Sequence, residues 1–220
     1  MNYSVAEENY IKTIFHLQGE NNTVNTNALA QELDTRPASI TDMLKKLKLK
    51  KLVHYQAYQG FRLTNEGRKV ALEIIRRHRL WEFFLSEKLK FSWEEVHEVA
   101  EQLEHVSDKK LIDRLDEYLN FPKFDPHGDP IPDSSGKMIV SRQINLTDLP
   151  LNKMAEVCKV GNQSAEILDL LKHNKINIGT KLEVKKKFDF DNSMEIKIRQ
   201  CLPITISEQL AKNIFVKYAS

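Results

Sequence analysis

Apolar residues recur every three or four positions through most of the first 120 residues, which is the spacing of one face of an α-helix. Near residue 50 the pattern changes to short runs typical of strands, bounded by turn-forming residues. The predicted elements are helices over residues 10–17, 26–33 and 38–47, with a break at 19–22, and strands over 52–55 and 61–63, joined by a turn near 58–60. A short helix, a tight turn, a basic helix and a hairpin are typical of a winged helix-turn-helix.

The middle of the chain continues the helical period, whereas the last third does not. We expect a long helix that contains His78 and Glu82, a helix around 97–105, and a third over 109–119. The apolar stripe of this third helix, which we expect to pack on a second subunit, is Leu111, Ile112, Leu115 and Leu119. A proline-rich strap over 122–133 and a linker over 134–137 follow. The last third alternates short strands (154–160, 182–185, 194–198 and 214–216) with one helix (164–172), which predicts a small β-barrel.

Positive charge is concentrated on the predicted helix 38–47 and just after it. Residues 45–51 contain five lysines, and a basic helix after a tight turn favours DNA binding. On that helix, the side opposite Ile40, Met43 and Leu44 would face the nucleic acid. The DNA-contacting candidates are Arg36, Ser39, Thr41, Asp42, Lys45 and Lys46.

Composition narrows the class of protein. With 220 residues, 41% hydrophobic and 29% charged, the chain has the make-up of an ordinary soluble protein. We find no apolar run of roughly 20 residues and no signal peptide at the start. Cys158 and Cys201 are too few for a disulfide framework. We therefore expect a cytoplasmic protein with no membrane partner.

Two imidazoles and two carboxylates share one strip of the predicted helix 97–105. At about 100° per residue, Glu101 and Glu104 lie about 40° and 20° on either side of His97, and His105 lies about 80° away. Mixed nitrogen and oxygen donors suit Mn(II), Fe(II) or Zn(II). A solvated charged face is the alternative. The apolar residues expected on the opposite, core-facing side are Val96, Val99, Leu103 and Val106.

Four stretches together carry a resemblance to a known family: Glu8–Ile14, Arg77–Glu82, Val96–Val106 and the strap Pro126–Pro132. The chain resembles the metal-dependent transcriptional regulators of the diphtheria toxin repressor and manganese transport regulator family. The resemblance implies a mainly α fold with some β: a winged helix-turn-helix (1–65), a helical dimerisation and metal-binding domain (66–140) and a C-terminal SH3-like barrel (143–220). It implies a homodimer that binds a double-stranded DNA operator and is not an enzyme.

The resemblance also implies two metal sites. The primary site would consist of Asn9, Glu101, Glu104 and His105. The ancillary site would consist of His78, Glu82 and His97, completed by Gln163 and Glu166 from the barrel.

The metal is indicated by departures from the family pattern. Iron-sensing members have cysteine where Glu101 stands, and a carboxylate favours hard Mn(II), so we expect Mn(II) first and Fe(II) second. Asn9 is neutral where manganese-sensing members commonly have aspartate. Lys12 stands where two-domain members have a glutamate ligand, which favours separate sites over a binuclear one. The alternatives are a winged-helix regulator that needs no metal and a metal-dependent hydrolase.

Overall fold

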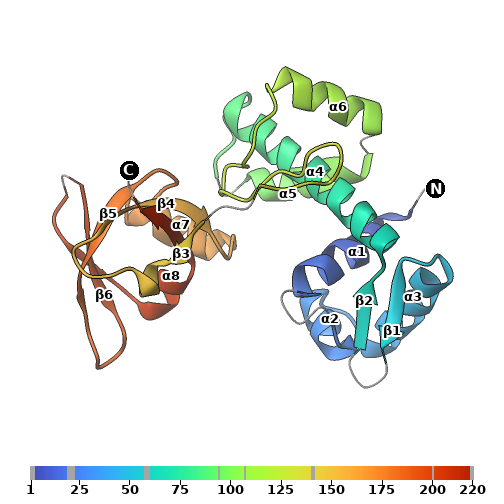
Figure 1. The fold of residues 1–220 in the computed structure, drawn as a ribbon, viewed down its shortest axis with the longest axis horizontal. Helices are drawn as coiled ribbons and strands as arrows, with labels where there is room; N and C mark the ends of the chain where they lie inside the picture. The colour runs from blue at the N-terminus through green and yellow to red at the C-terminus, as the bar shows by residue number, and fades with distance from the viewer. Residues whose placement is uncertain are drawn as a thin grey trace. The chain divides into compact units, whose positions relative to one another are not determined.

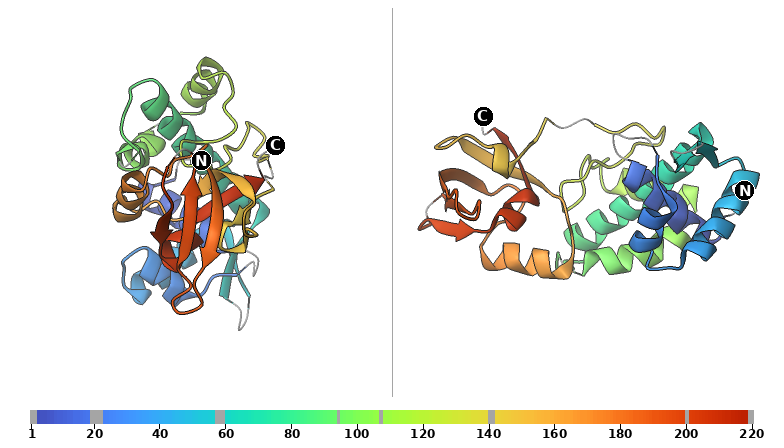
Figure 2. Two further views of the ribbon diagram at one scale, coloured as in Figure 1. Left: turned by 90° about the vertical axis from the view of Figure 1, so that its left-hand side faces the viewer. Right: turned by 90° about the horizontal axis from the view of Figure 1, so that it is seen from below.

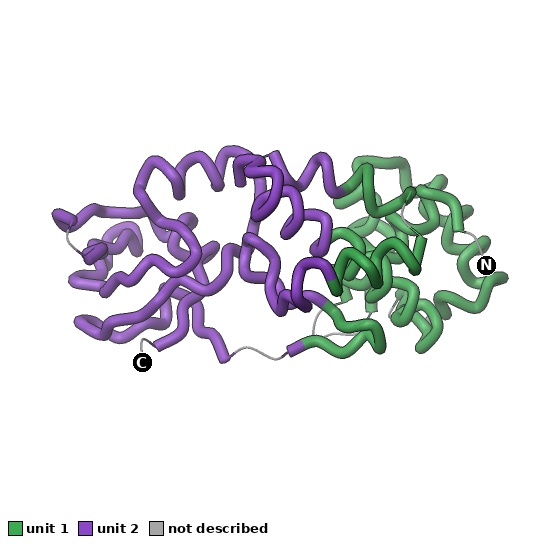
Figure 3. Tube along the Cα trace, turned by 90° about the horizontal axis from the view of Figure 1, so that it is seen from above, with its two compact units in different colours: residues 1–78, 101–117, 132–138 green, residues 79–100, 118–131, 139–220 purple. Residues whose placement is uncertain are grey.

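The computed structural model describes residues 3–18, 23–56, 60–93, 95–106, 108–139, 142–199 and 201–218, and Figure 1 shows its ribbon. The chain forms two compact units, coloured separately in Figure 3. Unit 1 comprises Met1–His78, Glu101–Glu117 and Pro132–Met138, and unit 2 comprises Arg79–Ala100, Tyr118–Ile131 and Ile139–Ser220. These units cut across the middle segment, so the expected domain limits of 1–65, 66–140 and 143–220 stay a prediction.

The N-terminal part of unit 1 is three helices and a hairpin. Its elements are α1 (Val5–Gln18), α2 (Thr26–Glu32), α3 (Pro37–Leu49), β1 (Val53–Gln56) and β2 (Gly60–Leu63). The Asn25 side chain caps α2 by accepting the Ala28 N–H, and Pro37 opens α3. Strand β1 pairs antiparallel with β2. These elements match the predicted ones, while the expected break at 19–22 and most of the turn near 58–60 lie outside the described residues.

The same unit has a single apolar core beneath the helices and the hairpin. Its fully buried side chains come from each of the three helices, as the 3.6-residue period predicts. The largest are Ile11, Ile14, Leu29, Ile40, Leu44 and Leu47. Met43, expected inside, is only half-buried.

Helices α4 (Asn65–Glu87), α5 (Val96–Val106) and α6 (Lys109–Tyr118) agree with the three predicted helices. Their apolar stripes correct two expectations. Of the four residues predicted for the stripe of α6, Ile112, Leu115 and Leu119 are buried within this chain and Leu111 is exposed. The stripe is therefore not free as a whole to cover a second subunit. On α5, Val106 is 78% exposed, so the expected apolar side is not uniformly the core side.

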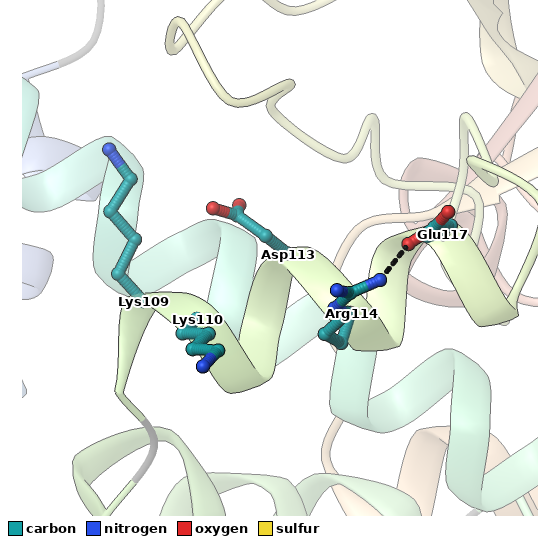
Figure 4. A pocket seen from close by; sticks show the side chains of 5 residues that line it. All are labelled: Lys109, Lys110, Asp113, Arg114 and Glu117. Atoms are coloured by element: carbon teal, nitrogen blue, oxygen red, sulfur yellow. Dashed lines mark hydrogen bonds and ion pairs between the residues drawn. The ribbon is translucent and has the colours of Figure 1, made fainter.

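Helix α6 is held to α4 in unit 1 by a buried cation. The Arg76 guanidinium contacts Asp113 and Asp116, each at 2.8 Å. The outer side of α6 forms a shallow hollow lined by exposed charged groups, including the pair Arg114 and Glu117 at 3.1 Å, as Figure 4 shows. This hollow brings together no group of metal-ligating side chains among the described residues.

The C-terminal part of unit 2 contains a six-stranded antiparallel sheet in the order β3-β8-β4-β5-β6-β7. Figure 2 shows the ribbon of this part, coloured yellow to red, from two further sides. Its elements are β3 (Ile144–Asn145), η1 (Leu146–Asp148), β4 (Met154–Val160), α7 (Ala165–His173), β5 (Lys181–Lys187), β6 (Met194–Ile198), β7 (Ile204–Ile206), α8 (Glu208–Lys212) and β8 (Ile214–Tyr218). Register shifts in β4 and β5 interrupt two ladders, and such bulges bend a sheet. The predicted strands and helix are confirmed, whereas β3, β7 and α8 were not predicted.

The proline-rich strap is non-helical and packs on β4 within unit 2. The His127 carbonyl accepts the Val160 N–H at 3.0 Å. Gly128 has φ +87°, and a Cβ there would come within 1.9 Å of the Cys158 carbonyl oxygen, so only glycine fits. The expected linker 134–137 contains an ordered turn instead.

The turn in that segment is organised by one carboxylate. Asp133 accepts the Ser135 hydroxyl and the N–H groups of Ser135 and Lys137. These hydrogen bonds lower the pKa of Asp133 to about 2.

Candidate metal centres

The first candidate centre lies within unit 1, between α1 and α5. Ligand atoms of Glu101, Glu104 and His105 lie within 4.8 Å of one another. Glu104 is fully buried, whereas the other two residues are partly exposed. Asn9 on α1 is the fourth predicted member, and its buried Oδ1 has no hydrogen-bond partner. A buried carbonyl oxygen without a donor is costly, and a cation would satisfy it. The residues present therefore fit a divalent metal.

Charge around this centre is balanced by two groups, the Lys12 ammonium and the His78 imidazole. Lys12 Nζ lies 2.6 Å from Oε1 of Glu101 and 2.7 Å from Oε1 of Glu104. His78 Nδ1 lies 2.7 Å from Oε2 of Glu104. Burial acts to raise the pKa of Glu104, but the neighbouring His78 and Lys12 outweigh it and the pKa is lowered. Glu104 is thus an anionic donor at neutral pH.

Glu8 contacts the first candidate centre and was not among the residues selected from the sequence. Its Oε2 lies 2.6 Å from Nδ1 of His105, and its Oε1 accepts a hydrogen bond from Arg77 at 2.7 Å. We assign the Nδ1 proton of His105 to this contact, which leaves the Nε2 lone pair for a metal. Nε2 is 3.4 Å from Oε1 of Glu104. Helical periodicity could not reveal Glu8, because its partner is 97 positions away in the sequence.

The second candidate centre lies within unit 2, where α4 meets the strap. Ligand atoms of Glu82, Asp125 and His127 lie within 4.8 Å of one another, and all three residues are buried. His97 Nδ1 on α5 lies 3.2 Å from Glu82 Oε1. The ancillary set implied by the family resemblance included Glu82 and His97 but not Asp125 and His127. The only signal in the sequence was Asp and His two positions apart in a proline-rich segment.

Electrostatics at this second centre favour a cation. Burial and the neighbouring Glu82 and Asp129 raise the pKa of Asp125 well above its usual range, against the opposing effect of Arg79. Burial also lowers the pKa of His127, which keeps the imidazole neutral. A metal ion would relieve the repulsion among the carboxylates.

The His127 ring is oriented by Trp93. His127 Nε2 lies 3.3 Å from the Trp93 carbonyl oxygen, to which we assign its proton, and the two rings stack at 5.5 Å. Nδ1 is then a buried acceptor, and it has no hydrogen-bond partner. This orphaned nitrogen indicates that the second group of residues also fits a divalent metal.

The remaining predicted ancillary residues have other surroundings. His78 lies beside Glu104 in unit 1. The Gln163 amide donates to Asp129 at 2.9 Å, and Asp129 also contacts Lys159 at 2.8 Å. Glu166 is exposed on α7. Gln163 thus contacts Asp129 rather than a member of the second centre. None of the metal-ligating groups found among the described residues includes Glu166.

The candidate DNA-contacting side chains all lie on the exposed side of α3 or directly before it. Thr41 donates to the Pro37 carbonyl, and Lys45 pairs with Asp42 at 3.2 Å. The exposed candidates are Arg36, Ser39, Thr41, Asp42, Lys45 and Lys46. No helix in the described part of the chain has both the length and the apolar content to cross a bilayer.

Family models match three consecutive parts of the chain, and known regulators are similar to it in sequence. Residues 3–61 match the N-terminal DNA-binding domain of iron-dependent repressors, 64–133 match their metal-binding and dimerisation domain, and 144–218 match the FeoA domain. The regulator MntR of Oceanobacillus iheyensis is 34% identical over 118 residues, which is 54% of this chain and 80% of MntR. The repressor IdeR of Mycobacterium bovis is 33% identical over 125 residues, 57% of this chain and 54% of IdeR.

Solved structures extend the likeness over the whole chain. A manganese-dependent transcriptional repressor in complex with manganese has a TM-score of 0.88 and 29% identity, covering 97% of this chain and all of the other. The manganese regulator SloR has a TM-score of 0.79 and 28% identity, covering 97% and 98%. The predicted fold class is confirmed. The chain therefore belongs to the iron-dependent repressor family, the metal-dependent transcriptional repressors that include MntR and IdeR.

Proposed function

We propose that this chain is a Mn(II)-activated repressor that binds its DNA operator as a homodimer, with Fe(II) as a second activator. The observation that carries the proposal is the first centre. There a buried carboxylate, a second carboxylate and an imidazole lie within 4.8 Å of one another, and the predicted fourth ligand, Asn9, has a buried Oδ1 without a hydrogen-bond partner. All donors are oxygen or nitrogen, which suits Mn(II).

The first centre would join the DNA-binding helices to the rest of unit 1. Asn9 comes from α1, which shares a core with α2 and α3, whereas Glu101, Glu104 and His105 come from α5. A bound metal would supply positive charge to these donors and would join Asn9 on α1 to the three ligands on α5. Fixing α1 restricts where α3 points, and a dimer needs its two recognition helices about one DNA turn apart.

The second centre would have a structural role in unit 2. Glu82, Asp125 and His127 would hold a metal between α4 and the strap, with His97 beside Glu82. Gln163 would support it through Asp129. This assignment differs from the ancillary set expected from sequence, in which His78 and Glu166 were also ligands.

At the DNA interface, Ser39 and Thr41 would contact bases or phosphates at the start of α3, and Lys45 and Lys46 would contact phosphate. The relatives are transcriptional regulators, so they give no support to the hydrolase alternative. We expect the chain to act in the cytoplasm, on the DNA that carries its operator.

The direct test is Glu104→Gln, with Glu98→Gln as the control on an exposed position of the same helix. Glu104→Gln removes one anionic donor while keeping the side-chain volume, so it should abolish one equivalent of Mn(II) binding and the Mn(II)-dependent affinity for DNA. Mn(II) binding is followed by electron paramagnetic resonance of the free ion. DNA binding is followed by fluorescence anisotropy on a duplex selected from a random pool in the presence of Mn(II).

Both variants should keep the wild-type circular dichroism spectrum and oligomeric state, and the Glu98→Gln variant should also keep wild-type binding. Normal metal dependence of DNA binding in the Glu104→Gln variant would show that the primary-site assignment is wrong.

A further inference from the structure

The position of Lys12 is the feature of the first centre that the proposed function leaves unexplained. Its Nζ donates to Oε1 of Glu101 at 2.6 Å and to Oε1 of Glu104 at 2.7 Å. The Lys12 side chain is 12% exposed and that of Glu104 is 0% exposed, so water screens the contact poorly. Two of the proposed metal ligands are therefore already bound to a cation supplied by the chain.

An ion at the first centre would have to share those oxygens with Lys12. Oε1 of Glu104 also faces Nε2 of His105, the third proposed ligand, at 3.4 Å. Carboxylate oxygens bind a divalent ion at roughly 2.0–2.2 Å. An ion on Oε1 of Glu104 would thus lie within about 5 Å of Nζ, by the sum of the two contact distances.

The charges do not favour both cations at once. Glu101 and Glu104 bring two negative charges, which one divalent ion balances completely. Keeping the ammonium as well would leave a surplus positive charge in a partly buried site, where like charges repel strongly. The long, flexible lysine stem allows the ammonium to leave for solvent.

We propose that Lys12 is a built-in competitor of the metal: its ammonium occupies Glu101 and Glu104 in the metal-free protein, and a divalent ion must displace it. This inference rests on the proposed first centre. Lys12 then raises the free Mn(II) concentration at which the first centre fills, because breaking its two ion pairs makes the free energy of metal binding less favourable.

The test is the affinity for Mn(II) of the Lys12→Met variant, measured as free Mn(II) by electron paramagnetic resonance. Methionine keeps the apolar stem and removes the charge, so the dissociation constant of the first centre should fall by about tenfold or more. The metal-free variant should also melt at a lower temperature than wild type, and Mn(II) should raise that midpoint by more, because the two carboxylates then have no ammonium.

Three matched variants complete the design. Lys50→Met removes another ion pair of α1, Lys50 with Glu7 at 2.6 Å, and should leave Mn(II) affinity unchanged. Lys12→Arg keeps the charge and should bind Mn(II) no more tightly than wild type. Lys12→Gln keeps a polar side chain without charge, and it should show the same gain in affinity if the methionine variant fails to fold.

The outcomes separate this inference from the proposed function. If Glu104→Gln removes one equivalent of Mn(II) but neutral side chains at position 12 leave the affinity unchanged or weaker, Lys12 is not a competitor although the centre is real. If Glu104→Gln binds Mn(II) as wild type does, both the centre and the competition are overturned.

Discussion

At each candidate centre one histidine, His105 or His127, owes its orientation to a group that would not touch the metal. Glu8 accepts from Nδ1 of His105, and the Trp93 carbonyl accepts from Nε2 of His127. The two rings therefore present opposite nitrogens to their centres. Outer hydrogen bonds of this kind fix the tautomer and the ring plane. They come from residues remote in sequence, which is why reading the chain found the donor set of the first centre but not its support.

Glu101 is the position at which metal preference should be most easily changed. Replacing it with cysteine puts a thiolate beside Glu104 and His105, and a soft donor disfavours Mn(II) relative to Fe(II). We expect Glu101→Cys to shift activation of DNA binding toward Fe(II) and away from Mn(II). The measurement is an anaerobic DNA-binding titration with Mn(II), Fe(II) and Zn(II) in turn.

Two results would count against this reading of Glu101. One is an unchanged order of metals in the cysteine variant. The other is a wild-type protein that responds to Fe(II) at far lower free metal than to Mn(II), since Glu101 could not then be the selector.

Among the helices and strands, those long enough to show a repeating pattern of apolar residues could be predicted from the sequence. Helices α1 to α7 and the longer strands have a clear period of apolar residues, whereas β3 and β7 span only two and three residues and cannot show one. Helix α5 shows a different limit. Its apolar and charged sides are evident in the sequence, but Glu104 is fully buried and Val106 is 78% exposed. The contacts of Glu104 with Lys12 and His78, which no local pattern encodes, permit that burial.

Helix α3 gives a prediction for DNA binding. Lys46 is exposed on the side away from the apolar core, so its ammonium is available to a phosphate. Lys46→Ala should weaken binding to all duplex sequences alike and reduce the slope of log K against log salt by about 1. Anisotropy titrations over a range of salt concentrations measure that slope.

The exposed Lys197 on β6, in the other unit, supplies the control, and Lys197→Ala should leave the slope as it is. A wild-type slope in the Lys46→Ala variant would remove Lys46 from the interface.

For the whole molecule, the proposed function predicts that the affinity for DNA depends on bound metal and that the fold does not depend on it. Removing metal with a chelator should reduce DNA binding to its non-specific level, because Asn9 on α1 is then no longer joined to the α5 ligands through an ion, and the circular dichroism spectrum should not change. Saturating Mn(II) at about 100 times its dissociation constant should raise the melting midpoint by roughly 5 to 10 °C. Scanning calorimetry and anisotropy on the same samples provide both quantities.

The chelator experiment also decides the remaining alternative from sequence. A chelated protein that keeps its full affinity for the selected duplex would be a winged-helix regulator that needs no metal. Restoration of binding by added Mn(II) alone excludes damage by the chelator.

The pairing of Lys12 with Glu101 and Glu104 also bears on how the chain is made. Small zinc domains stay unfolded until their ion arrives, because the free energy of metal binding supplies their free energy of folding. Here the chain carries its own cation beside the two carboxylates. We therefore expect a newly synthesised molecule to fold unit 1 even when the cell lacks manganese. A sensor has to exist before its signal. If Lys12 replaces the ion in this way, the protein would be folded but not bound to its operator while manganese is scarce, and it would already be present when manganese returns.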